Sequence, residues 1–332
     1  MANTETAAVT ADNRENNTSK ARRIEAIDIA RGVALLAMAS YHFIWDLEMF
    51  GYAAQGTAAT GWPKLYARGI ASSFLFLVGL SLVLAHQARF EPAKFGRRLA
   101  TIVAAAALVS IGTYFAFPHA FIFYGILHSI AVSSIVALAF LHLPALITLT
   151  IGIAVIALPN YFNTPVFDAD WLVWTGLSER IPRSLDFVPF FPWFGPVLLG
   201  VAAGDLAKQF GILNYLADLP KTPATISRPI SFISRHSLAF YLVHQPILIA
   251  LIWAFSQVAP ADGTLAYLGS CQKSCEERQD AVMCKRFCMC TAESLKKEDL
   301  LSNLQSGTIR PAENPQMLEI ARICTRKAEG TN

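Results

Sequence analysis

The amino-acid sequence predicts an all-α membrane protein: a polytopic bundle of about seven transmembrane helices followed by a small, Cys-rich helical tail. Hydrophobic residues make up 54% of the 332 residues and charged residues only 15%, which is too apolar for an ordinary soluble domain. The apolar residues gather into seven runs of spanning length, roughly twenty residues each. All six cysteines come after the last of these runs.

The apolar runs define the expected domains. Each run must be helical, because lipid offers no partner for an unpaired backbone group. We expect a disordered cytoplasmic tail over 1–23, a membrane domain over 24–258 and a Cys-rich extracytoplasmic tail over 259–332. The fifth run is the shortest. The runs lie at about 26–47, 67–87, 98–117, 122–142, 143–160, 187–207 and 236–258.

Positive charges predict the orientation of the bundle. They cluster before the first run and in alternate connections, and such clusters favour the cytoplasmic side. We therefore expect a cytoplasmic N-terminus and, after seven spans, a C-terminus outside. The net charge of +3 is small and the Lys and Arg residues sit in short clusters between apolar runs, so nucleic acid is not an expected partner. The apolar runs make membrane lipids the expected partners. The clustered residues are Lys20, Arg22, Arg23, Arg89, Lys94, Arg97, Arg98, Lys208, Lys221, Arg228 and Arg235.

The cysteine spacing predicts disulfide bonds in the tail. Two C-x3-C motifs are separated by eight residues, and a spacing of four places both thiols on one helix face. Two short helices can thus be joined as an antiparallel hairpin, for which Cys271–Cys288 with Cys275–Cys284 is the simplest pairing. A zinc site is the alternative, but such sites usually use C-x2-C motifs with nearby histidines, and none follows His244. Disulfides also suit a tail outside the cytoplasm.

Ionisable residues within the first apolar run are the strongest indication of function. Asp28, Arg31, His42 and Asp46 all lie in this run, and such groups are costly at membrane depth and usually functional. His42 and Asp46 are four residues apart, so they share a helix face, as a general base and its orienting carboxylate would. Arg31 lies three turns earlier, where a cation can hold a phosphate-bearing donor. Asp28 and Arg31 can alternatively be interfacial residues.

Polar residues in later runs are further candidates for substrate binding. His128 lies within the fourth run, where a catalytic role and a packing hydrogen bond are both open. His244 and Gln245 precede Pro246 in the middle of the seventh run. A proline at this position permits a kink, and kinked helices with polar neighbours often line cavities. No metal site is predicted.

Four segments together resemble a known family. EAIDIARGVALLAMASYHFIWDL resembles the opening helix of the heparan-alpha-glucosaminide N-acetyltransferase catalytic family, in particular its short bacterial relatives. FYGILHSIAVSS, DFVPFFPWFGPVLLGVAAG and SRHSLAFYLVHQPILI resemble later family blocks in the same order. The spacing of Arg31 and His42, with ten residues between them, also matches the pattern of the distantly related acyltransferase 3 membrane proteins.

The resemblance implies an acyltransferase in the bacterial inner membrane. It would move an acyl group, expected to be acetyl, from cytosolic acyl-CoA to a hydroxyl or amine of a periplasmic or lipid-linked glycan. His42 would be the base or acyl carrier, Asp46 its partner and Arg31 a donor contact. The lysosomal enzyme's catalytic histidine lies in the loop after its first helix. The loop Glu48–Lys64 has no histidine, so glucosaminide chemistry is not carried over.

Two other classes of protein compete with an acyltransferase. A small-solute or proton-coupled transporter would use the same His and Asp as a relay, although no inverted repeat supports it. A structural or assembly protein would act through its Cys-rich tail, but such an anchor has no need of ionisable residues in its first span.

Overall fold

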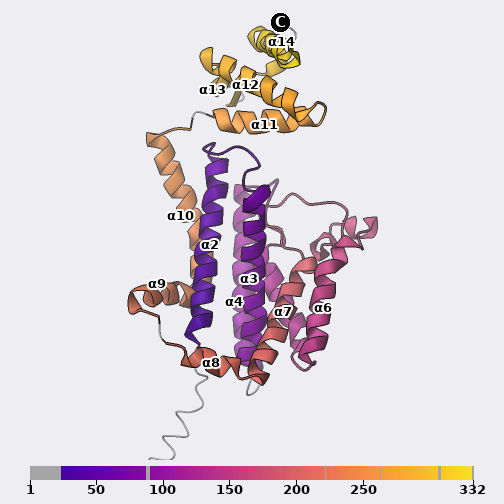
Figure 1. Ribbon diagram of the computed structural model, residues 1–332, viewed down its shortest axis with the longest axis vertical. Coiled ribbons are helices and arrows are strands. Elements are labelled where there is room, and N and C mark those ends of the chain that lie inside the picture. Colours follow the sequence, from indigo (N-terminus) through magenta and orange to yellow (C-terminus); the bar gives the residue numbers. More distant parts are fainter. Residues whose placement is uncertain (1–23, 87–89, 221, 262, 306–307, 331–332) are drawn as a thin grey trace, which may run out of the picture. The chain divides into compact units, whose positions relative to one another are not determined.

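The computed structural model describes residues 24–86, 90–220, 222–261, 263–305 and 308–330. Within these residues the chain is helical and contains no strand, and Figure 1 shows the order of the helices. The expected disordered tail over 1–23 lies outside the described residues. The helices are α2 (Glu25–Met49), α3 (Gly61–Ala85), α4 (Pro92–Ala116), α5 (Ile126–Ala137), α6 (Ala145–Ala157), α7 (Phe190–Gln209), α8 (Ile212–Asp218), α9 (Ala224–Arg235), α10 (Ser237–Val258), α11 (Thr264–Glu276), α12 (Ala281–Lys297), α13 (Leu300–Gln305) and α14 (Pro315–Glu329).

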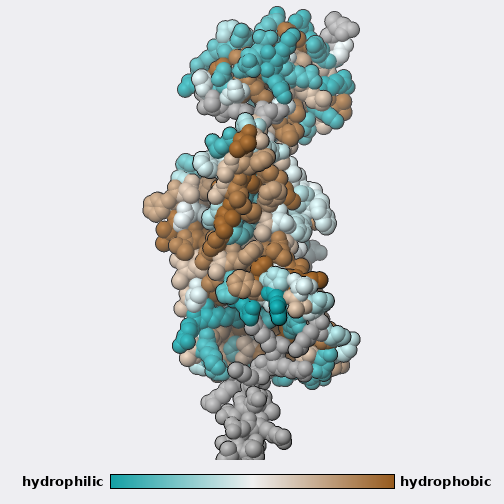
Figure 2. Space-filling model, turned by 90° about the vertical axis from the view of Figure 1, so that its left-hand side faces the viewer, coloured by the Kyte–Doolittle hydropathy of each residue, from teal (hydrophilic) through white to brown (hydrophobic). Residues whose placement is uncertain are grey.

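The predicted fold class, a helical membrane bundle, is confirmed. Helices α2, α3, α4, α7 and α10 are long and apolar enough to cross a membrane. The fourth and fifth expected spans form shorter apolar helices, Ile126–Phe140 and Ala145–Asn160, each ending in a 3-10 turn. The surface of the apolar helices is largely hydrophobic in Figure 2, whereas α11–α14 present mostly hydrophilic residues. This surface is what lipid contact requires of the bundle.

The chain forms two compact units. The first comprises Met1–Ala34 and Ser72–Ser237, and the second comprises Leu35–Ala71 and Leu238–Asn332. The expected domain boundaries at 24 and 258 are not tested by this division and stay a prediction.

Close helix packing forms the core of the first unit. A Cβ atom on Gly79 of α3 would overlap the carbonyl oxygen of Val197 on α7, and one on Gly200 would overlap that of Phe76. Small residues let transmembrane backbones approach in this way, since lipid provides little hydrophobic force between helices. The buried core around this contact consists of Leu75, Leu82, Ala137, Val188, Phe194, Val197, Leu198 and Val201.

Helix α7 has an irregular start. The helix is broken at Phe191 in the PFFPWFGP stretch, where the backbone is extended at φ −95° and ψ 131°. The residue before a proline is pushed towards this region, here by Pro192. Regular helix therefore begins only after this point.

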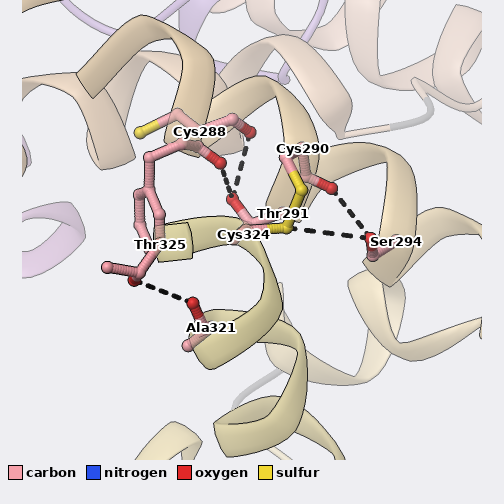
Figure 3. The surroundings of a disulfide bond; sticks show 8 residues. Cys288, Cys290, Thr291, Ser294, Ala321, Cys324 and Thr325 are labelled. Atoms are coloured by element: carbon pink, nitrogen blue, oxygen red, sulfur yellow. Dashed lines mark hydrogen bonds between the residues drawn. A yellow bond between two sulfur atoms is a disulfide. The ribbon is translucent and has the colours of Figure 1, made fainter. Parts of the chain in front are cut away.

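The second unit contains the disulfide-linked helices α11–α14. Disulfides Cys271–Cys288 and Cys275–Cys284 join α11 to α12, which is the simplest of the pairings that the spacing left open. A third, Cys290–Cys324, joins α12 to α14 beside Ser294 (Figure 3). Among the described residues no group of three or more His, Cys, Asp or Glu side chains could hold a metal ion. The prediction of disulfide bonds is confirmed. These helices also bury a small apolar core, which consists of Leu295, Leu300, Leu301 and Met317.

Candidate functional site

Asp46 and Gln245 form the first contact of the candidate site. Both belong to the second unit, although they lie 199 residues apart in sequence. Gln245 Nε2 on α10 donates a hydrogen bond of 2.6 Å to Asp46 Oδ1 on α2. Asp46 is fully buried, and a buried carboxyl needs such a donor because desolvation is costly. The pair therefore ties α10 to this part of α2.

His42 and His244 form the second contact between the same helices. Their ring centroids are 5.0 Å apart, with an angle of 59° between the ring planes. His42 lies one turn before Asp46 on α2, and His244 directly precedes Gln245 on α10. His244 is buried, whereas His42 is partly exposed. The structure thus brings together four of the residues that the sequence singled out.

The ring of His244 has a defined protonation. Its Nδ1 lies 2.7 Å from the carbonyl oxygen of Tyr241 and 3.2 Å from that of Phe240. Because a carbonyl oxygen only accepts hydrogen bonds, Nδ1 must carry the proton and donate it. The neutral ring then has a lone pair at Nε2, which is buried and has no partner among the described residues.

Three buried polar atoms of this cluster lack a hydrogen-bond partner within the described residues. They are Asp46 Oδ2, His244 Nε2 and Gln245 Oε1. Most buried polar atoms in folded proteins are paired, so each exception calls for an explanation. A lone pair on each of these atoms can accept a hydrogen bond, so the cluster can bind a group that carries hydrogen-bond donors.

Asp46 and His42 do not form the hydrogen bond that their spacing suggested. The carboxyl is instead paired with Gln245, and the nearest aromatic partner of His42 on another helix is His244. The functional roles of these residues stay predictions. Helical spacing identified the face of α2 correctly, but it contained no information about which side chains of α10 meet that face.

Arg31 and Asp28 lie together in the first unit. Arg31 Nη2 donates to Ser81 Oγ on α3 at 2.8 Å, and Nη1 is 3.7 Å from Asp28 Oδ1. Their side chains are 27% and 12% exposed, so the guanidinium is partly accessible but already hydrogen-bonded. A donor phosphate at Arg31 would therefore share this cation with its existing partners.

His128 is engaged at the start of α5 in the first unit. Its Nδ1 accepts a hydrogen bond of 3.2 Å from the backbone N–H of Gly125. Its Nε2 is 3.2 Å from Ser110 Oγ, whose own proton is donated to the carbonyl of Ile122. Both ring nitrogens thus have local partners, which favours the packing interpretation of this residue over a catalytic one.

Asp186 belongs to the same region, and the sequence analysis missed it. Its Oδ2 accepts a 2.8 Å hydrogen bond from the backbone N–H of Ile126, the first residue of α5. Burial raises the pKa of this carboxyl to about 6, although the hydrogen bond opposes the rise. A helix N-terminus favours a carboxylate acceptor. The sequence feature that could have identified Asp186 is its position as the first residue of the DFVPFFPWFGP segment.

Comparison with known proteins agrees with the resemblance. The model of the family described as heparan-alpha-glucosaminide N-acetyltransferase, catalytic, matches residues 23–246. This range includes all four residues of the α2–α10 cluster and excludes helices α11–α14. No curated protein matches the chain, and no solved structure does.

Proposed function

The chain belongs to the heparan-alpha-glucosaminide N-acetyltransferase catalytic family, and from that membership we propose that it is an integral membrane acyltransferase using acyl-CoA. The donor is acetyl-CoA or another acyl-CoA, and the acceptor is a hydroxyl or amine of a periplasmic or lipid-linked glycan. The observation that carries the proposal is the cluster of His42, Asp46, His244 and Gln245 inside the matched range. Such a cluster of polar side chains between apolar helices supports a functional role rather than packing, and the family membership favours acyl transfer as that role.

His42 is the proposed base. It takes the proton from the acceptor hydroxyl or amine while the acceptor atom attacks the thioester carbonyl. The new bond forms to the acyl carbon, the carbon–sulfur bond breaks, and the proton passes on to the thiolate of CoA. An acyl-histidine at His42 is the alternative course. Arg31 contacts the phosphates of the donor in either case.

The proposed setting is the bacterial inner membrane, with the N-terminus in the cytoplasm and helices α11–α14 in the periplasm. Positive charge in alternate connections supports this orientation. The three disulfides support it independently, because disulfides persist in oxidising compartments.

Acyl transfer is tested by release of CoA thiol and by transfer of label from radiolabelled acetyl-CoA to the glycan and lipid fractions of membranes from expressing cells. His42→Ala should lower transfer by about 10²–10⁴-fold, the usual contribution of a general base. His236→Ala is the control, because this exposed histidine lies within the matched range but outside the cluster. Full transfer by a folded His42→Ala protein would refute the proposal.

The same measurements address the transporter alternative. A transporter that used His42 and Asp46 as a proton relay would neither bind CoA nor release its thiol. Thiol release that depends on His42 therefore excludes that class, and its absence in the wild type would favour it.

A further inference from the structure

Within the part of the chain that the structure describes, no donor meets the Nε2 atom of His244. Nδ1–H is held by the carbonyls of Tyr241 and Phe240, so only Nε2 remains for another partner. A buried acceptor without a hydrogen bond destabilises the folded state, because it has lost its contact with water and gained nothing in return. The site is therefore more stable when a neighbouring N–H or O–H meets this nitrogen.

His42 is the neighbour best suited to supply that N–H. The rings that lie near His244 belong to Phe240, Tyr241 and His42, and Phe240 carries no donor. Tyr241 precedes His244 by one turn on the same helix, whereas His42 approaches from α2. The two rings do not form this hydrogen bond in the structure. Their centroids are 5.0 Å apart, which is close to the separation that a hydrogen bond of about 2.9 Å between two ring nitrogens requires, so a turn of the His42 ring would bring its N–H to Nε2.

We propose that His244, rather than Asp46, is the residue that orients His42: its Nε2 accepts the N–H of His42 and leaves the second nitrogen of His42 to take the substrate proton. This inference rests on the proposed acyl transfer with His42 as base. Acceptance by His244 fixes the tautomer of His42 and stabilises the imidazolium that forms when it is protonated, as an orienting group does in a catalytic triad.

Asp46 and Gln245 have a supporting role in this arrangement. Their 2.6 Å hydrogen bond joins the residue one turn after His42 to the residue directly after His244. The contact therefore sets the position of α10 against this part of α2, and with it the separation of the two rings. Asp46 acts on the base through helix position and not through direct contact.

A double-mutant cycle on acyl transfer tests the proposal. His244→Leu removes the acceptor and should lower kcat by about 10²-fold with KM for acetyl-CoA little changed, since an orienting group acts in the transition state. In a His42→Ala background the same substitution should cost nothing further, because its effect passes through His42. His244→Gln retains an acceptor oxygen and should recover part of the rate.

The controls separate this inference from the proposed function. His236→Leu should leave transfer unchanged, and the elution profile and thermal midpoint report whether each variant is folded. If His42→Ala abolishes transfer while His244→Leu is fully active, the inference fails and the proposed function stands. If His42→Ala is fully active, the proposed function fails.

A spectroscopic measurement tests the proposed hydrogen bond even if no acyl transfer can be measured or the His244 variants do not fold. In wild-type protein with ¹⁵N-labelled histidine in lipid nanodiscs, His244 should show a protonated Nδ1 and a hydrogen-bonded acceptor at Nε2. In His42→Ala that Nε2 signal should move towards a free lone pair. An unchanged signal would overturn the proposed hydrogen bond.

Discussion

The first unit and helices α11–α14 achieve tight packing by opposite means. In the first unit, glycines let α3 and α7 touch backbone to backbone at Gly79 and Gly200. In α11–α14, three disulfides cross-link helices that bury only a small apolar core. Lipid-embedded helices gain little from hydrophobic burial and depend on close contact. A small domain in water has too little core and depends on covalent links.

The largest expected effect is at the glycine contact. Gly200→Leu places a side chain where even a Cβ would overlap the carbonyl oxygen of Phe76, and a backbone atom cannot move aside as a side chain can. We expect loss of folded protein, measured by fluorescence-detected size exclusion. Gly112→Leu on α4 is the matched control, because nothing lies within 4 Å of its Cβ position. Equal folded yields for the two variants would contradict the packing argument.

Removing disulfides should affect α11–α14 according to loop length. Cys290 and Cys324 are 34 residues apart, whereas Cys275 and Cys284 are 9 apart. Chain entropy predicts losses of about 4 and about 3 kcal/mol for the paired serine variants. Hydrogen–deuterium exchange in the full-length protein should show faster exchange in α14 for Cys290→Ser/Cys324→Ser, with α3 and α7 unchanged. Faster exchange throughout the bundle would show that the two regions are not held independently.

Asp186 gives the first unit a pH dependence. Its folded pKa of about 6 lies above the ordinary value of 3.8, so the folded state binds the proton more tightly. Its contribution to stability is therefore present below about pH 4 and is lost as the pH rises to about 6. In Asp186→Asn the thermal midpoint should therefore depend less on pH between about pH 4 and about pH 6 than it does in the wild type. Asp186→Ala should cost about 1–3 kcal/mol, because the N–H of Ile126 loses its acceptor.

The smallest effect is the opposite pH dependence in α12. Asp280 accepts hydrogen bonds of 3.0 Å from the backbone N–H groups of Val282 and Met283, and these bonds lower the pKa of its carboxyl. Its stabilisation is present above the ordinary value and is lost on acidification. The protection factors of the amides in α12 should fall below about pH 4 in the wild type, and Asp280→Asn should weaken that response. An identical response in the variant would assign the effect to another group.

Local patterns in the sequence were enough for much of the fold. Of the seven predicted spans, five are helices long enough to cross a membrane and two are shorter apolar helices. The sequence could place them because the length and hydropathy of a segment are properties of that segment alone. The four-residue spacing of Cys271 and Cys275 likewise indicated a stapled hairpin, and the structure has it. The polar residues of the first run were found for the same reason, because a charge in an apolar segment is visible without a fold.

Only the tertiary structure decided which distant residues meet. Asp46 with Gln245, His42 with His244, Asp186 with the start of α5, and Cys290 with Cys324 are all long-range pairs. Helical periodicity specifies which face a residue occupies but not what packs against that face. The face of His42 was therefore readable from the sequence, whereas its neighbour on α10 depended on how two helices, far apart in the chain, pack together.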